Sequence, residues 1–134
     1  MLAAPSARLE PPPCHVPVEI HRVVDGDTIT ATINLPWGVT LRRRSVRLLG
    51  YDAWESSRVR RINGKPPSDA ELAKGKAATK ALAALLASST GTWLQPGPRE
   101  LDRYGRPLGW LTVDVDGERI KIADWMTAHN HARP

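Results

Sequence analysis

The chain of 134 residues is long enough for one compact domain and too short for two ordinary ones. Its 19 Lys and Arg outnumber 14 Asp and Glu, and the net charge of +5 favours a polyanionic partner such as nucleic acid, unless it serves solubility alone. The single cysteine, Cys14, excludes an internal disulfide and a cysteine-based zinc cluster.

Residues 1–15 include three consecutive prolines and predict a flexible leader ahead of one domain over residues 16–134. The leader lacks a basic segment followed by a long apolar one, so it is not a recognisable secretion signal. No apolar run reaches membrane-spanning length. The sequence as written indicates a cytoplasmic protein, and removal of a signal would instead indicate a secreted one.

Alternating apolar residues predict three strands in the first half of the domain. The second is the clearest, because threonines alternate with aliphatic residues from Thr28 to Leu35. Asp25-Gly26-Asp27 has the composition of a turn before it, and Pro36-Trp37-Gly38 ends it. The expected strands begin at Val16, at Thr28 and at Val39, the last running through the polar residues 42–44 to Leu49.

A helix is expected over residues 69–88, because Ser68 to Glu71 has the S-x-x-E form of a capping box and apolar residues follow at helical spacing. Gly75 costs about 1 kcal/mol inside a helix, so a later start is an alternative. Further strands are predicted at residues 93–94, closed by the prolines at 96–98, and at residues 108–115 and 119–122. A short final helix is predicted at residues 123–129. This order predicts a mainly β, α+β fold, a small barrel carrying helices.

Three polar clusters lie where strands are predicted to end. Carboxylate oxygens suit a hard cation such as calcium, and a guanidinium matches phosphate oxygens with paired donors. Crowded acids without a cation would repel one another and raise a pKa. Taken alone, each cluster is typical of an exposed turn or a structural ion pair. Together they predict a site for a metal and a phosphodiester: Asp25 and Asp27; Arg47, Asp52 and Glu55; Asp102, Arg103, Tyr104 and Arg106.

The segments 24–29 (VDGDTI), 46–55 (VRLLGYDAWE) and 102–106 (DRYGR), in this order, resemble the staphylococcal nuclease (thermonuclease) family. The likeness spans roughly residues 18–134. It implies an OB-fold, five-stranded barrel with helices. It also implies a calcium-dependent endonuclease that hydrolyses phosphodiester bonds of DNA and RNA, as single strands or locally opened duplex, and leaves 3′-phosphates.

The resemblance also implies a role for each matched residue. Asp27, Asp52 and the backbone carbonyl of Ala53 would be calcium ligands. Glu55 would activate or orient the attacking water. The remaining matches act on the substrate: Arg47 and Arg106 as catalytic arginines, and Tyr104 as a contact to the nucleotide phosphate.

The chain departs from the family at several places. Asp52-Ala53-Trp54-Glu55 stands where the family usually has D-T-P-E, so the position of Glu55 is less constrained, and Trp54 is interpreted either as a base-stacking or as a packing residue. The resemblance stops at Pro134, before the family's later tyrosines and third helix, so it implies nothing about base preference or stability. The loop after Glu55 is longer and basic, and we expect it to steer the substrate unless it is only solvated: Arg58, Arg60, Arg61 and Lys65.

The main alternative function is a catalytically inactive nucleic-acid-binding OB-fold module. A barrel for protein contacts alone would leave the acids and arginines without a role. The complete set of charged residues favours catalysis, because a binding module does not need Glu55.

Overall fold

The computed structural model describes residues 10–54 and 67–134. Glu55, Arg58, Arg60, Arg61 and Lys65 therefore lie outside the described residues, as do residues 1–9 of the predicted leader. The described elements are, in order, β1 (Val16–Asp25), β2 (Thr28–Asn34), η1 (Pro36–Gly38), β3 (Thr40–Leu48), α1 (Asp69–Ala87), β4 (Gly91–Leu101), β5 (Pro107–Val115), β6 (Glu118–Lys121) and α2 (Ile122–Ala128).

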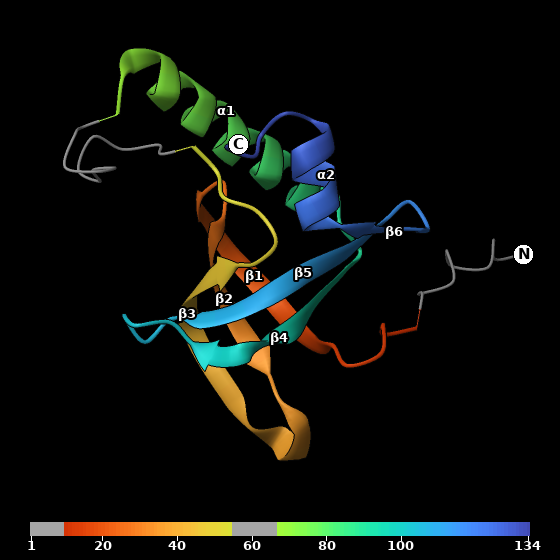
Figure 1. Cartoon of the computed structure of the whole chain (residues 1–134). Coiled ribbons are helices and arrows are strands. Elements are labelled where there is room, and N and C mark those ends of the chain that lie inside the picture. Colours follow the sequence, from red (N-terminus) through yellow and green to blue (C-terminus); the bar gives the residue numbers. More distant parts are fainter. Residues whose placement is uncertain (1–9, 55–66) are drawn as a thin grey trace, which may run out of the picture.

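The strands form one sheet in the order β3-β2-β1-β4-β5-β6. Neighbours in this order pair antiparallel, and β3 also pairs with β5 in parallel, with Arg47 opposite Leu108. This pairing closes five strands into a barrel, so the expected OB-like α+β fold is confirmed. Figure 1 shows α1 and α2 gathered at one end of the barrel, and the β2–β3 hairpin reaching away from them.

Local signals explain the element boundaries. The Ser68 hydroxyl accepts a hydrogen bond from the Glu71 backbone nitrogen at 3.2 Å, so α1 begins at Asp69 in spite of the buried Gly75. Our expectation that residues 96–98 close the fourth strand is wrong. β4 continues to Leu101, because the prolines lie at an irregularity where the ladder to β5 shifts register and lost donors are tolerated.

The core lies inside the barrel and beneath the helices. Strand residues such as Ile29 and Val46 are fully buried there, together with Leu82 of α1 and Met126 of α2. Trp110 is 36% exposed, because it lies on the face of β5 opposite to the buried Leu111. Among the described residues, neither helix has the length and apolar character needed to cross a membrane.

The turn between β1 and β2 packs against two other segments at very short range. A Cβ added to Gly26 would lie 2.6 Å from the Cβ of Ala53 and 2.9 Å from that of Ala78. The turn therefore needs glycine for space. This contact brings the Asp25–Asp27 turn, the segment after β3 and helix α1 together.

We predict that Gly26→Ala destabilises the protein by about 1–3 kcal/mol, the usual cost of an overpacked methyl group. Urea unfolding at neutral pH measures the change. Adding Ala53→Gly removes the nearest clash and should recover part of the loss. Equal stability of Gly26→Ala and the parent would contradict the packing.

Candidate active site

Arg47 lies at the centre of the first polar cluster. Its Nη1 is 3.1 Å from Oδ2 of Asp27 and donates to the Leu48 carbonyl at 2.7 Å. Both Nη atoms lie near the Tyr51 carbonyl, at 3.4 and 3.5 Å, and Nη2 donates to Oδ1 of Asp52. The guanidinium is only 19% exposed. Arg47 thus ties the chain that leaves β3 to the β1–β2 turn.

Asp27 is buried in that turn. Its Oδ2 accepts a hydrogen bond from the Ala53 nitrogen at 2.9 Å, and its Oδ1 accepts one from the Thr28 hydroxyl at 3.2 Å. Burial raises the pKa of Asp27 to about 6, with a further rise from its side-chain hydrogen bond to Asp25, against the lowering effect of Arg47. Burial is the main cause of this shift, and repulsion from the Asp25 charge, which was expected from the sequence, adds only a small part.

Tyr51 is a site residue that the sequence interpretation missed. Its hydroxyl donates to the Gly26 carbonyl at 2.6 Å, so it fastens the same turn from the other side. Burial, and then the nearby Asp27 charge, raise the pKa of Tyr51, which keeps the hydroxyl a donor. The available signal was a lone aromatic residue between two predicted polar positions, Arg47 and Asp52.

The segment after Tyr51 is held by the C-terminal end of the chain. Ala53 forms a bridge with Ala132, and the Asp52 carbonyl accepts a hydrogen bond from the Arg133 nitrogen at 2.6 Å. The Asp52 side chain remains 63% exposed. Its backbone is therefore fixed while its carboxylate can exchange partners.

The second cluster is the loop between β4 and β5. Asp102 accepts hydrogen bonds from the Tyr104 nitrogen at 2.9 Å, the Arg106 nitrogen at 2.8 Å and the Arg106 Nε at 2.6 Å. Burial opposes ionisation of Asp102, but these bonds outweigh it and lower its pKa. Gly105 takes a positive φ of +77° to complete the turn. Tyr104 is 70% exposed beside the Arg106 guanidinium.

The two clusters meet at one end of the closing strand pair. Arg106 directly precedes β5, and Arg47 pairs with Leu108 two residues later. The structure thus brings Asp27, Arg47, Asp52 and Ala53 together. Arg106 and Tyr104 lie on the neighbouring loop, with Arg106 held by its own acid.

Trp54 lies beside helix α1. Its ring is half-buried, and the Lys74 ammonium is 4.5 Å from the ring centroid. Base stacking by Trp54 and packing of Trp54 against the barrel both stay predictions.

The donor chemistry of the first cluster fits a hard cation. Asp27 and Asp52 converge on one guanidinium, and the raised pKa of Asp27 marks an acid that another positive charge would keep ionised. Within residues 10–54 and 67–134, no group of three or more His, Cys, Asp or Glu is arranged to hold a metal. The third expected acid, Glu55, lies outside that part of the chain.

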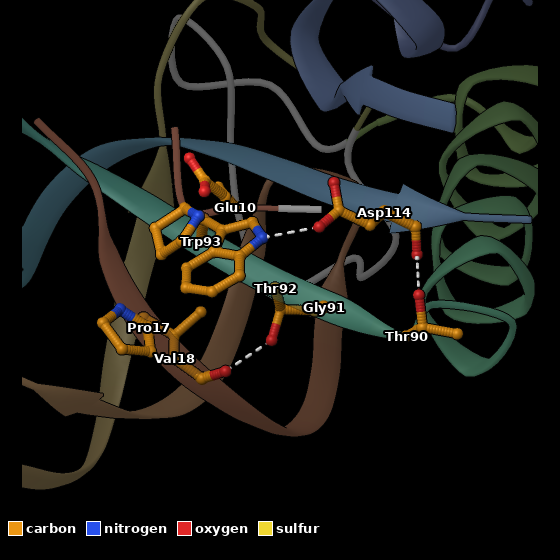
Figure 2. Close-up of a pocket in the computed structure, with 9 residues that line it drawn as sticks. Glu10, Pro17, Val18, Thr90, Gly91, Thr92, Trp93 and Asp114 are labelled. Atoms are coloured by element: carbon orange, nitrogen blue, oxygen red, sulfur yellow. Dashed lines mark hydrogen bonds between the residues drawn. The ribbon is translucent and has the colours of Figure 1, made fainter. Parts of the chain in front are cut away.

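A surface groove of about 570 Å³ lies elsewhere, between β1 and β4. Figure 2 shows its main polar feature, the Trp93 Nε1 that donates to Asp114 at 2.8 Å. Burial opposes ionisation of Asp114, but hydrogen bonds from Arg119 and Trp93 outweigh it and lower its pKa. Asp114 is thus a satisfied structural carboxylate, and the groove has no residue of the predicted site.

A scan of protein-family models finds no match to the chain, and a search of curated proteins finds none either.

We predict that burial of Asp27 makes stability fall as pH rises from about 4 to about 6. The folded state binds the Asp27 proton more tightly than the unfolded state, so this contribution is full below pH 4 and lost through pH 6. Across this pH range, the free energy of unfolding of Asp27→Asn should rise by about 2 kcal/mol relative to that of the parent. Urea unfolding at each pH measures the difference.

Asp116→Asn, in the exposed β5–β6 turn, is the matched control, since it removes a carboxylate outside the cluster. Parallel pH profiles for the parent and Asp27→Asn would contradict the buried carboxyl.

Proposed function

We propose that this protein is a calcium-dependent endonuclease of the staphylococcal nuclease type, which hydrolyses DNA and RNA and leaves 3′-phosphates. The observation that carries the proposal is the convergence of Asp27 and Asp52 on Arg47, next to the loop of Arg106. This combines acidic oxygens for a cation with guanidinium groups for a phosphate.

The proposed ligands of calcium are Asp27, Asp52 and the Ala53 carbonyl, and the bound ion would polarise the scissile phosphate. Buried Asp27 is a preformed ligand, since the Thr28 hydroxyl and Ala53 nitrogen already fix its carboxylate. Asp52 is the adjustable ligand, because its backbone is anchored while its side chain is exposed.

The two arginines are proposed to bind the non-bridging oxygens of the diester and to stabilise the charge that builds there. Arg47 holds both acids in the described structure, so it must turn one of its Nη atoms from Asp52 to the phosphate. Because the Asp52 carboxylate is exposed, this exchange needs only a small rearrangement of side chains. Arg106 is held by Asp102 through Nε, which orients its Nη edge.

Glu55 is the proposed general base, which orients a water molecule for in-line attack and takes its proton. It follows Asp52 by three residues in the chain. Tyr104, exposed beside Arg106, is the proposed contact to a neighbouring phosphate. The basic residues after Glu55 raise the local concentration of a polyanion through long-range attraction.

One observation favours the alternative of a catalytically inactive nucleic-acid-binding module. Arg47 and Arg106 are each already paired with a carboxylate, as structural arginines are. A binding module would keep the Arg47–Asp52 pair when nucleic acid is added, whereas the proposed nuclease must exchange it.

We predict that the protein cleaves single-stranded DNA and RNA in calcium and that a chelator stops cleavage. Glu55→Gln should lower the rate about 10²–10⁴-fold, because the general base is lost. Arg47→Lys should lower it about 10²–10³-fold, because lysine cannot offer paired donors to the phosphate. Gel assays of labelled oligonucleotides measure these rates.

Lys80→Gln, on the exposed face of α1, is the control for a lost charge outside the site. Binding of the Glu55→Gln protein to the same oligonucleotide should match the parent, which separates catalysis from affinity. A folded parent protein that binds but never cleaves in calcium would establish the binding module and refute the nuclease.

A further inference from the structure

The tip of the β2–β3 hairpin carries an aromatic side chain that packing does not explain. Trp37 is 96% exposed, and its backbone lies in the left-handed region at φ 62°, which is uncommon for a bulky residue. Gly38 follows with a φ of +73°, and Val39 beyond it is 49% exposed. An apolar ring held in water contributes little to folding, so its exposure indicates a partner that would cover it.

The strand that returns from this tip is strongly basic. Residues 34–48 contain Arg42, Arg43, Arg44 and Arg47 and no Asp or Glu. The first three of these arginines are exposed. We call the β2–β3 hairpin (residues 28–48) the arm. Its charged side chains are all positive, which fits a polyanionic partner.

A β-bulge alters the alternation of these arginines. Ala31 pairs with Arg44 and Ile33 with Leu41, so Arg42 and Arg43 together oppose Thr32. Arg43 has a φ of 47°, and its nitrogen donates to the Thr32 hydroxyl at 3.3 Å. A bulge of this kind turns side chains away from the regular pleat. Three consecutive guanidinium groups can thereby surround one short stretch of strand.

The backbone of β3 joins the hairpin to the candidate active site. β3 carries both Arg44 and Arg47, about 10 Å apart at the usual rise of a strand. Figure 1 shows the hairpin tip at the end of the barrel away from the helices. The pairing of Arg44 to Arg47 with β2 is regular, so the two side chains lie on opposite faces of β3, and a nucleic-acid strand bound at the tip would have to cross β3 to reach Arg47.

We propose that the β2–β3 hairpin binds single-stranded nucleic acid, with Trp37 stacked on a base and Arg42 and Arg44 on backbone phosphates. This inference rests on the proposed function and adds to it a substrate-binding arm outside the cleavage site. An unpaired strand is favoured because a base can cover an exposed ring only when it leaves its own stack. The guanidinium groups supply contacts that do not depend on sequence.

The test is binding of a labelled oligothymidine in chelator, where no cleavage is expected. Trp37→Ala should weaken binding about 5- to 100-fold, the range of one lost base stack. Arg42→Gln with Arg44→Gln should lower the slope of log affinity against log salt by about 1.4, since each phosphate contact on a single strand contributes about 0.7. Arg43 is left unchanged because its backbone forms the bulge.

Two matched controls separate the arm from general effects. Trp110→Ala removes another surface tryptophan, from β5, and should leave affinity unchanged. Lys76→Gln with Lys80→Gln removes the same charge from the exposed face of α1 and should leave the salt slope unchanged. Acrylamide quenching adds a direct readout, since oligothymidine should protect the parent fluorescence more than that of Trp37→Ala.

Three results would overturn the proposal. One is parental affinity and salt slope in both hairpin variants. Another is binding of the parent to phosphatidylserine vesicles, lost in Trp37→Ala, with no effect on oligothymidine. The last is a dimer in sedimentation that Trp37→Ala dissociates. Cleavage by the parent in calcium is measured separately. The results therefore distinguish a nuclease whose hairpin does not bind nucleic acid from a hairpin that binds nucleic acid in a protein without nuclease activity.

Discussion

The candidate site depends on one half-buried guanidinium, that of Arg47. Arg47 joins the carboxylates of Asp27 and Asp52 with the backbone carbonyls of Leu48 and Tyr51, so a single side chain connects β3, the β1–β2 turn and the segment that follows β3. The guanidinium favours the charged form of Asp27, against the burial that raises the pKa of that carboxyl. The same arrangement leaves acidic oxygens and a guanidinium side by side, which is what a metal-assisted attack on a phosphodiester requires.

The barrel makes this arrangement possible by close contact rather than by hydrogen bonds alone. Gly26 lets the acidic turn approach Ala53 and Ala78, and the Tyr51 hydroxyl then fastens the turn through its carbonyl. These contacts bury Asp27 and raise its pKa. A stable fold and a chemically poised carboxyl thus have the same origin in one tightly packed corner.

The sequence predicted the strands and α1 well, because alternating threonines and a capping box are local signals. It could not predict the parallel pairing of β3 with β5, which depends on how the barrel closes. The grouping of Asp27, Arg47 and Asp52 followed from motif order, whereas Tyr51 was missed because its role comes from a contact across 25 residues of chain.

Carbon-detected NMR titration of the Asp27 carboxyl, with and without calcium, tests the central claim most directly, because a cation must compete with the proton on that group. In chelator the carboxyl should titrate near pH 6. In calcium the midpoint should fall toward the ordinary aspartate value of about 4, since the ion stabilises the charged form. The same titration curve in both conditions, up to millimolar calcium, would contradict a cation held by Asp27 beside Arg47.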